Sequence, residues 1–288
     1  MSSHDSHAKG HKGHGHTHAM GSSYSHGHPE RIAPGDGLWE SHLAEHAQRY
    51  EFASARVRPG ARVLDAGCGV GYGTAMLADS GAQLVVGVDI APDAIAVARK
   101  SFARQNAIFV QEDCMELTES KRHAPFDCIV NLENLEHVGD ADRFLERVVS
   151  VLAPGGVFLV STPNRTAMNR FHGAGPDAPT SNPFHVTEWT PEELRDLLSR
   201  RFELVTLHYQ TYDPPDRLLY EPILSLLWSN PFARLGRRLQ RYLRGRRIAA
   251  RAEDLLPPPQ HRIMSENPGA HLVVTVLAEC RHPRSAVS

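Results

Sequence analysis

The sequence lacks long apolar runs, paired cysteines and an excess of charge of one sign. None of its 288 residues fall in an apolar run of about 18, so we expect no membrane-spanning helix. The start, MSSHDSHAKGHKGHGHTHAMGSS, lacks the apolar stretch of a signal peptide. The formal net charge of -2 predicts no general attraction to nucleic acid. These absences argue against a membrane-spanning, secreted or generally nucleic-acid-binding protein.

Cysteine is scarce and its spacing is uninformative. Cys68, Cys114, Cys128 and Cys280 form no CxxC or zinc-finger pattern. We therefore expect free thiols in a reducing compartment rather than a disulfide framework. Hydrophobic content is 41% and charged content 22%, so the chain can build a substantial core. Together these properties predict a globular protein located in the cytoplasm.

Histidine, by contrast, is concentrated at the start of the chain. Eight of the 18 histidines lie within residues 1–28, among Gly, Ser and Lys. This composition cannot bury a core, so we expect residues 1–30 to be disordered. Imidazoles at this density bind Zn, Ni or Cu, and both a native metal-storage tail and an affinity tag would account for them. We exclude this tail from the fold argument.

From residue 38 onward, segments with helical periodicity alternate with short apolar runs. The apolar runs, such as LVVGVDI at 84–90, are almost uniformly hydrophobic. Buried strands separated by helices predict a parallel sheet that is covered on both faces. Strands are expected at 62–66, 84–90, 107–111, 128–132, 157–161, 202–209 and 271–278, with helices at about 38–57, 73–79, 93–104, 140–152 and 190–200.

The most informative stretch is VLDAGCGVGYG at 63–73. A strand, a glycine-rich turn and a helix direct backbone N–H groups into the crevice at the strand end. A dinucleotide site requires G-x-G-x-x-G, whereas Gly67, Gly69 and Gly71 are each separated by one residue. The Asp65 carboxylate would repel a pyrophosphate but would suit an ammonium group. This pattern disfavours a nicotinamide oxidoreductase and fits S-adenosylmethionine, a nucleoside with a cationic end.

Five motifs then follow in a fixed order: DAGCGVGYG, VVGVDI, EDC, NLENLEHV and LAPGGVFLVSTPN. Together they resemble the class I S-adenosylmethionine-dependent methyltransferase superfamily, in the style of its ubiquinone-type O-methyltransferases and bacterial sugar and natural-product methyltransferases. The resemblance covers about residues 38–210 and the last strand. It implies an α/β fold with a Rossmann-like seven-stranded sheet, mostly parallel with an antiparallel last strand, and helices on both faces. The expected organisation is a core at 31–210, an insertion at 211–270, and a last strand and tail at 271–288.

The resemblance also implies the cofactor contacts. Asp89 would accept both ribose hydroxyls, Asp113 would accept from the adenine amino group, and Ile90 would pack on the adenine face. A helix cap, an ordinary loop acid and a core side chain are the structural alternatives for these three. Arg49 and Tyr50 are alternatives for reaching the cofactor carboxylate. The expected cofactor-binding residues are Tyr50, Asp65, Gly67, Cys68, Gly69, Gly71, Asp89, Ile90, Asp113, Cys114 and Asn131.

Two histidines are the candidate catalytic residues. Methyl transfer to a hydroxyl requires alignment of the nucleophile and removal of its proton. His137, in the LEHV motif, follows the fourth strand and titrates in the working range of pH. His185, in NPFHVTEWT with Glu188, precedes the helix after the fifth strand. We expect both to lie at the acceptor site; the alternative is a structural role in loop packing.

A metal ion is not expected in this site. The carboxylates of Glu133, Glu136, Asp140 and Asp142 lie close together in the sequence and are the hard ligands that Mg²⁺ prefers. However, acids are also favoured before a helix N-terminus because of the helix dipole. We therefore assign no metal from the sequence.

The predicted insertion has its own composition. An apolar stretch, LLYEPILSLLWSNPF, precedes a segment with eight arginines between 234 and 251 and no acid. A basic amphipathic helix beside an apolar segment is typical of a membrane-surface contact, here through 220–251. A lid over the substrate, a homodimer contact or a solvated arginine face are the alternatives.

The sequence therefore predicts an S-adenosylmethionine-dependent methyltransferase. The expected acceptor is a hydroxyl on a small or lipid-linked metabolite, such as a sugar, a quinone-like phenol or a natural product, and nucleic acid is not an expected partner. C- and N-methylation stay open, because the cofactor half of the chain says nothing about the acceptor atom. The alternative from another class is a non-catalytic scaffold that binds the cofactor or metals.

Overall fold

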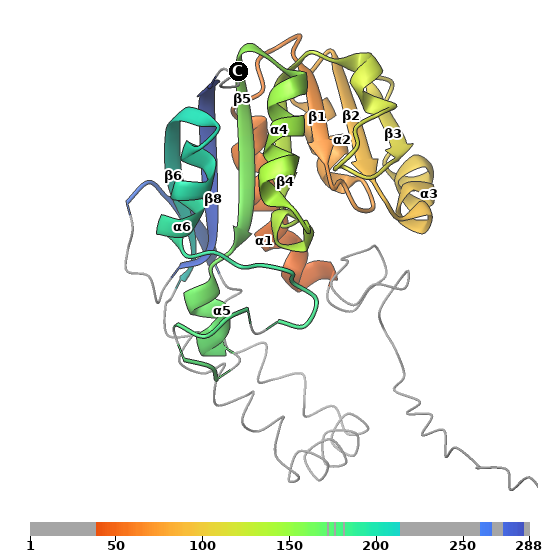
Figure 1. Ribbon diagram of the computed structural model, residues 1–288. Helices are drawn as coiled ribbons and strands as arrows, with labels where there is room; N and C mark the ends of the chain where they lie inside the picture. Colours follow the sequence, from red (N-terminus) through yellow and green to blue (C-terminus); the bar gives the residue numbers. More distant parts are fainter. Residues whose placement is uncertain are drawn as a thin grey trace, which may run out of the picture.

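One eight-stranded sheet runs through the described part of the chain, which in this computed structural model comprises residues 39–171, 173–175, 177–180, 182–213, 260–266 and 273–284 (Figure 1). The strand order is β3-β2-β1-β4-β5-β8-β6-β7. The strands are β1 (Arg62–Ala66), β2 (Leu84–Asp89), β3 (Ala107–Gln111), β4 (Phe126–Leu132), β5 (Leu152–Pro163), β6 (Phe202–Asp213), β7 (Gln260–Met264) and β8 (Val273–Pro283).

The first five strands are parallel and the last ones introduce antiparallel pairs. β1 pairs with β2 and β4, and β8 lies antiparallel between β5 and β6. The expected α/β Rossmann-like sheet, mostly parallel with an antiparallel last strand, is confirmed. Within the described residues the strands number eight rather than seven, because β7 pairs with the end of β6 at the sheet edge. This strand falls inside the segment 211–270 that we expected to be an insertion.

Helices cover both faces of the sheet, as the alternation of apolar side chains requires. Leu64 and Phe158 point to one face, where they pack against α4 and α6. Their neighbours Val63 and Leu159 point to the other face, against α1 and α2. The helices are α1 (Trp39–Ser54), α2 (Tyr72–Asp79), α3 (Pro92–Ser101), α4 (Ala141–Val151), α5 (Arg165–Phe171) and α6 (Pro191–Ser199).

Local signals explain where several helices begin. The Asp140 side chain accepts from the Arg143 N–H at the start of α4. At the start of α6, Thr190 and Glu193 form a capping box, with Pro191 at the first helical position. These caps anchor the two helices that cover the face opposite α1 and α2.

The fifth strand is longer than expected. We predicted a strand at 157–161 after a helix that ends at about residue 152, but β5 spans Leu152–Pro163 and includes Pro154, Gly155 and Gly156. Its register against β4 shifts from Phe126 paired with Leu152 to Cys128 paired with Val157. The Pro-Gly-Gly residues therefore form an irregularity inside the strand rather than a separate turn, because pairing resumes on both sides of it.

Several predictions fall outside the described residues: the tail at 1–30 and the apolar and arginine-rich segment at 220–251. Where the chain is described, none of the helices is both long enough and apolar enough to cross a membrane.

Candidate active site

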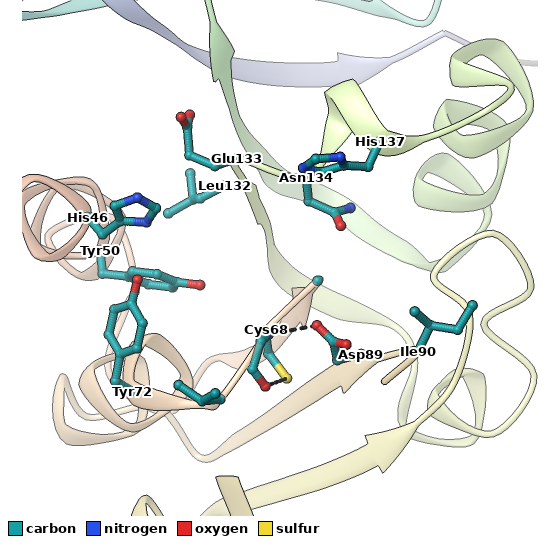
Figure 2. Close-up of a pocket in the computed structure, with 13 residues that line it drawn as sticks. His46, Tyr50, Cys68, Tyr72, Asp89, Ile90, Leu132, Glu133, Asn134 and His137 are labelled. Atoms are coloured by element: carbon teal, nitrogen blue, oxygen red, sulfur yellow. Dashed lines mark hydrogen bonds between the residues drawn. The ribbon is translucent and has the colours of Figure 1, made fainter. Parts of the chain in front are cut away.

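A pocket opens at the carboxyl ends of β1, β2 and β4, with α1 along one side (Figure 2). The strand order reverses between β1 and β4, and a ligand crevice is expected at such a switch point. The strand ends supply one wall of the pocket and the loop after β4 supplies another. Its lining residues are His46, Tyr50, Gly67, Cys68, Gly69, Val70, Tyr72, Asp89, Ile90, Leu132, Glu133, Asn134 and His137.

The glycine loop is held in place by β2. Gly69 has a φ of 54°, in the left-handed region, and its N–H donates to Asp89 Oδ2 at 2.9 Å. No atom lies within 4 Å of where a Cβ on Gly69 would stand, so a ligand can approach the backbone there. A Cβ on Gly71, in contrast, would lie 2.6 Å from the Ala98 side chain. Gly71 thus permits close packing of α2 on α3, and it does not line the pocket.

Asp89 presents a carboxylate at the end of β2. Besides the Gly69 N–H on Oδ2, its Oδ1 accepts from the Ala91 N–H at 2.9 Å. A carboxylate offers about four acceptor positions, so both oxygens can also accept hydroxyl groups of a ribose. The neighbouring Ile90 is 66% exposed, an unusual position for an isoleucine that suits an aromatic ring stacked on it.

Asp65 lies beneath the pocket rather than in its lining. It is fully buried, and it accepts from the Thr74 hydroxyl at 2.6 Å and from the Tyr50 hydroxyl at 3.3 Å. Burial raises the pKa of Asp65 to about 7, although both hydrogen bonds oppose that rise. Tyr50 lines the pocket, so any effect of Asp65 on a ligand at this end passes through the Tyr50 hydroxyl.

The buried Asp65 predicts a specific pH dependence of stability. Its pKa is about 7 in the folded protein and about 3.9 when unfolded, so between these values only the folded state keeps the proton. The free energy of unfolding should therefore fall as the pH rises from 5 to 7, by about 1.4 kcal/mol per pH unit at most from this group. Urea unfolding across this range should show a shallower fall for Asp65→Asn. An equal slope in both proteins would contradict the prediction.

Three other expected cofactor residues do not line the pocket. Asn131 is buried and donates to the Ala66 carbonyl at 2.7 Å, which ties β4 to the end of β1. Asp113 accepts from the Met115 N–H at 2.8 Å, which is the loop role that we held as its alternative. Cys114 Sγ accepts from the side chain of Asn134 at 3.7 Å. The roles of these residues toward the cofactor stay predictions.

Six lining residues were not among the cofactor-binding or catalytic residues expected from the sequence: His46, Val70, Tyr72, Leu132, Glu133 and Asn134. Of these, Glu133 has the clearest signal. It directly follows β4 and has a φ of 51°, a left-handed conformation that costs a non-glycine residue of order 1 kcal/mol. Its position two residues after Asn131 in NLENLEH could have identified it.

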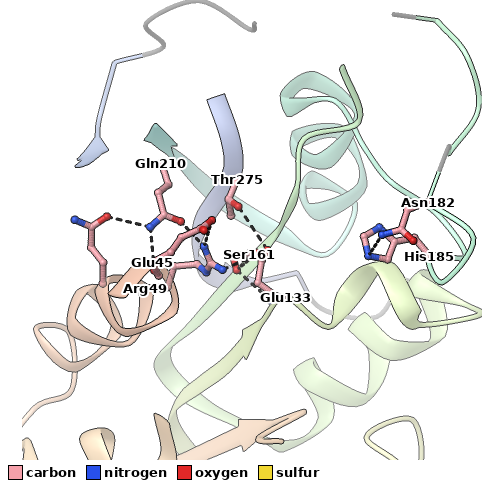
Figure 3. Close-up of polar contacts among 9 residues, drawn as sticks. Glu45, Arg49, Glu133, Ser161, Asn182, His185, Gln210 and Thr275 are labelled. Atoms are coloured by element: carbon pink, nitrogen blue, oxygen red, sulfur yellow. Dashed lines mark hydrogen bonds and ion pairs between the residues drawn. The ribbon is translucent and has the colours of Figure 1, made fainter. Parts of the chain in front are cut away.

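A buried polar cluster holds Glu133 in this conformation (Figure 3). The Arg49 side chain is 1% exposed and lies 3.5 Å from Glu133 Oε2 and 3.2 Å from Glu45 Oε1. It also donates to the side chain of Gln210, on β6. The Ser161 hydroxyl donates to Glu133 Oε1 at 2.7 Å. Arg49 therefore joins α1 to the loop after β4 and to the C-terminal strands, and it is Tyr50 that reaches the pocket.

Removal of the Arg49 guanidinium should destabilise the fold strongly. Arg49→Leu leaves Glu45 and Glu133 partly buried without their cation, and loss of one partner of a buried pair typically costs about 3–5 kcal/mol. Urea unfolding would measure this loss. Arg104→Leu is the matched control, because its pair with Asp79 is exposed and should contribute less than about 1 kcal/mol. Similar losses for the two variants would show that the cluster is not structural.

The two candidate catalytic histidines lie side by side. Their rings are 5.0 Å apart between centroids, edge to face. His137 Nδ1 donates to the Phe184 carbonyl at 3.0 Å, and His185 Nδ1 lies 2.6 Å from Glu188 Oε1. Only His137 lines the pocket, so His185 stands behind it. The sequence placed these residues in two separate motifs, and the structure brings the motifs together.

The geometry fits S-adenosylmethionine. The open backbone at Gly69 and the Asp89 carboxylate suit a nucleoside, and His137 stands at another wall of the same pocket. Fold and pocket together define the class of S-adenosylmethionine-dependent methyltransferases. Comparison with known protein families gives the same class: the family model described as "Methyltransferase domain" matches residues 38–208. The chain belongs to this methyltransferase domain family.

Curated relatives carry the same class name. A probable S-adenosylmethionine-dependent methyltransferase of Mycolicibacterium smegmatis is 36% identical over 169 residues, which are 59% of this chain and 62% of that protein. A ubiquinone biosynthesis O-methyltransferase of Xanthomonas axonopodis pv. citri is 35% identical over 159 residues, covering 52% and 66% of the two chains. The chain thus matches less than two thirds of each relative's length.

Solved structures support the fold alone. A SAM-dependent methyltransferase of Thermotoga maritima aligns with a TM-score of 0.53 at 14% identity, covering 85% of this chain and 92% of that one. The [4+2]-cyclase SpnF aligns with a TM-score of 0.51 at 17% identity, covering 86% and 84%. Since a protein named as a cyclase shares the fold, the reaction must be argued from the site.

Proposed function

We propose that the protein transfers the methyl group of S-adenosylmethionine to a hydroxyl oxygen of a small or lipid-linked molecule. The observation that carries this proposal is that His137 lines the same pocket as Asp89. The sulfonium carbon of the donor is already activated, so the enzyme has to orient the acceptor and receive its proton. The relative named as a ubiquinone biosynthesis O-methyltransferase supports a hydroxyl as the acceptor group.

His137 is well placed for this task. Its Nδ1–H donates to the Phe184 carbonyl, and in the neutral ring this places the basic lone pair on Nε2. The acceptor hydroxyl would give its proton to Nε2 as its oxygen bonds to the methyl carbon and the carbon–sulfur bond breaks. The electron pair of that bond leaves with the sulfur as S-adenosylhomocysteine. His185 and Glu188 would hold the loop that carries Phe184.

The test has two stages. Calorimetric titration of the protein with S-adenosylhomocysteine should show micromolar binding, while NADH as control ligand should show none. Hydroxylated acceptors, including sugars and catechol-type phenols, are then screened with labelled methyl donor, and the methylated atom is determined by NMR. Transfer to nitrogen or carbon would replace the O-methylation proposal. Binding without transfer to any acceptor would favour the non-catalytic scaffold.

We also propose a cytoplasmic protein that contacts the membrane surface through residues 220–251. The four free cysteines support the location, and the arginines and apolar side chains of the segment support the contact. Sedimentation with vesicles of anionic lipid, compared with zwitterionic lipid, tests the contact. Sedimentation equilibrium without lipid tests whether the segment forms a homodimer instead.

A further inference from the structure

Two histidines and a glutamate converge beside the pocket. Glu136, His137 and His185 each place a potential metal-ligand atom within 4.8 Å of the other two. They come from two segments, the short helix Leu135–His137 and the loop before α6. Figure 2 shows His137 at the pocket wall, and Figure 3 shows His185 on the same side of the sheet end.

One oxygen of each carboxylate beside these histidines is buried without a hydrogen-bond partner in the described part of the chain. Glu136 is 1% exposed and Glu188 is 0% exposed. Within the described residues, the Oε2 atom of each is buried and accepts no hydrogen bond. A buried acceptor without a partner costs about 1–3 kcal/mol, and more when it is charged. A cation bound to Glu136 would remove that cost at its Oε2 atom.

The histidines are oriented as metal ligands usually are. A ligating histidine donates its second ring N–H to a carbonyl or a carboxylate. The His137 Nδ1 has the Phe184 carbonyl at 3.0 Å, and the His185 Nδ1 has Glu188 Oε1 at 2.6 Å. Each ring can therefore offer Nε2 to an ion. At His185 this nitrogen lies 3.1 Å from the Asn182 amide, which the ion would displace.

We propose that Glu136, His137 and His185 bind one divalent transition-metal ion, with zinc as the ion to test. Two imidazoles favour such an ion over Mg²⁺, which prefers oxygen ligands. Ligand atoms around tetrahedral zinc lie about 3.4 Å apart at bond lengths of about 2.1 Å, so binding requires side-chain shifts of about 1 Å. The sequence, in contrast, led us to expect no metal.

The proposal rests on the proposed O-methylation and changes the role of His137 in it from proton acceptor to metal ligand. Because His137 lines the pocket, an open coordination position of the ion would face the acceptor. A hydroxyl bound there would have a lowered pKa and would lose its proton to solvent before methyl transfer. In the loaded site His137 is a ligand, and the ion replaces it as the group that activates the hydroxyl.

The histidine-rich tail would obscure a metal titration, so the test uses a full-length background in which the eight histidines of residues 1–28 are replaced by asparagine. Competition with a chromogenic chelator should show one Zn²⁺ per chain. His185→Ala and Glu136→Gln should weaken binding at least 100-fold, and Glu188→Gln about 10- to 100-fold through loss of the support for His185. His123→Ala, a histidine distant from the site in the sequence, should leave the affinity unchanged.

Two further measurements keep the result interpretable. Addition of Zn²⁺ to the otherwise unaltered background should shift the NMR signals of both rings, His137 and His185, which requires no variant to fold. Unshifted rings, or equal zinc affinity in background and variants, would overturn the metal site. Titration with S-adenosylhomocysteine reports separately on the methyltransferase proposal: zinc binding without nucleoside binding would reject that function and keep the metal site.

Discussion

His137→Ala is expected to lower kcat for methyl transfer by about 10²- to 10⁴-fold, the range typical for loss of a group that handles the transferred proton. The affinity for S-adenosylhomocysteine should change less than threefold, because we expect Asp89 and the glycine loop, rather than His137, to hold the nucleoside. Single-turnover transfer of labelled methyl measures the rate, and calorimetry measures the affinity. This separation distinguishes a group that acts on the acceptor from one that merely supports the pocket.

His123→Ala is the matched control for this variant. Its backbone carbonyl accepts from Arg62, a bond that the substitution preserves, and its ring does not line the pocket. It should keep the rate of the unaltered protein. A normal rate in His137→Ala would remove His137 from the acceptor chemistry, both as proton acceptor and as metal ligand.

Asp89→Ala is expected to weaken binding of S-adenosylhomocysteine more than 100-fold. The substitution removes the proposed acceptor for the ribose hydroxyls and also the acceptor of the Gly69 N–H. Hydrogen bonds to a charged group contribute about 1.5–3 kcal/mol each, so the loss of two accounts for this factor. Calorimetric titration measures it, and Asp79→Asn, at an exposed surface pair, should bind normally.

A modified ligand identifies the contact directly. The 2′-deoxy analogue of S-adenosylhomocysteine should bind the unaltered protein at least tenfold more weakly than the parent compound. In Asp89→Ala the two ligands should bind alike, because the coupling between carboxylate and hydroxyl is already lost. If the variant still discriminates against the deoxy ligand, the ribose is recognised elsewhere.

The sequence predicts the motif-bearing half of the fold well, for physical reasons. Almost uniformly apolar runs such as 84–90 are typical of buried parallel strands, and β2 lies there at Leu84–Asp89. β7 could not be predicted, because QHRIM has no clear alternation of apolar and polar side chains, and only its pairing with β6 makes it a strand. β6 extends beyond the predicted end at residue 209 for the same reason, because its last residues pair with β7.

The residues of the site likewise divide into those whose position the sequence predicts and those whose position it does not. Asp89 is the last residue of β2 and His137 lies in the motif that follows β4, both near the carboxyl end of a strand, so their motifs are sufficient to place them at the pocket. Asp65 also lies near the carboxyl end of a strand, β1. However, its short side chain is covered by Tyr50 from α1 and Thr74 from α2. The approach of His185 to His137 depends on the path of a loop 48 residues further on, which no local pattern specifies.

The Arg49 cluster has a consequence for what counts as a functional unit of this chain. The methyltransferase motifs end well before β6, yet the arginine beside the pocket is held by Gln210 on that strand, 161 residues away in the sequence. A fragment that ends after the motifs would retain every recognisable signature, but it would lose the contact between Arg49 and Gln210 that holds α1 in place. A functional fragment therefore has to include the buried contact between Arg49 and Gln210, and the family match alone does not define where that fragment ends.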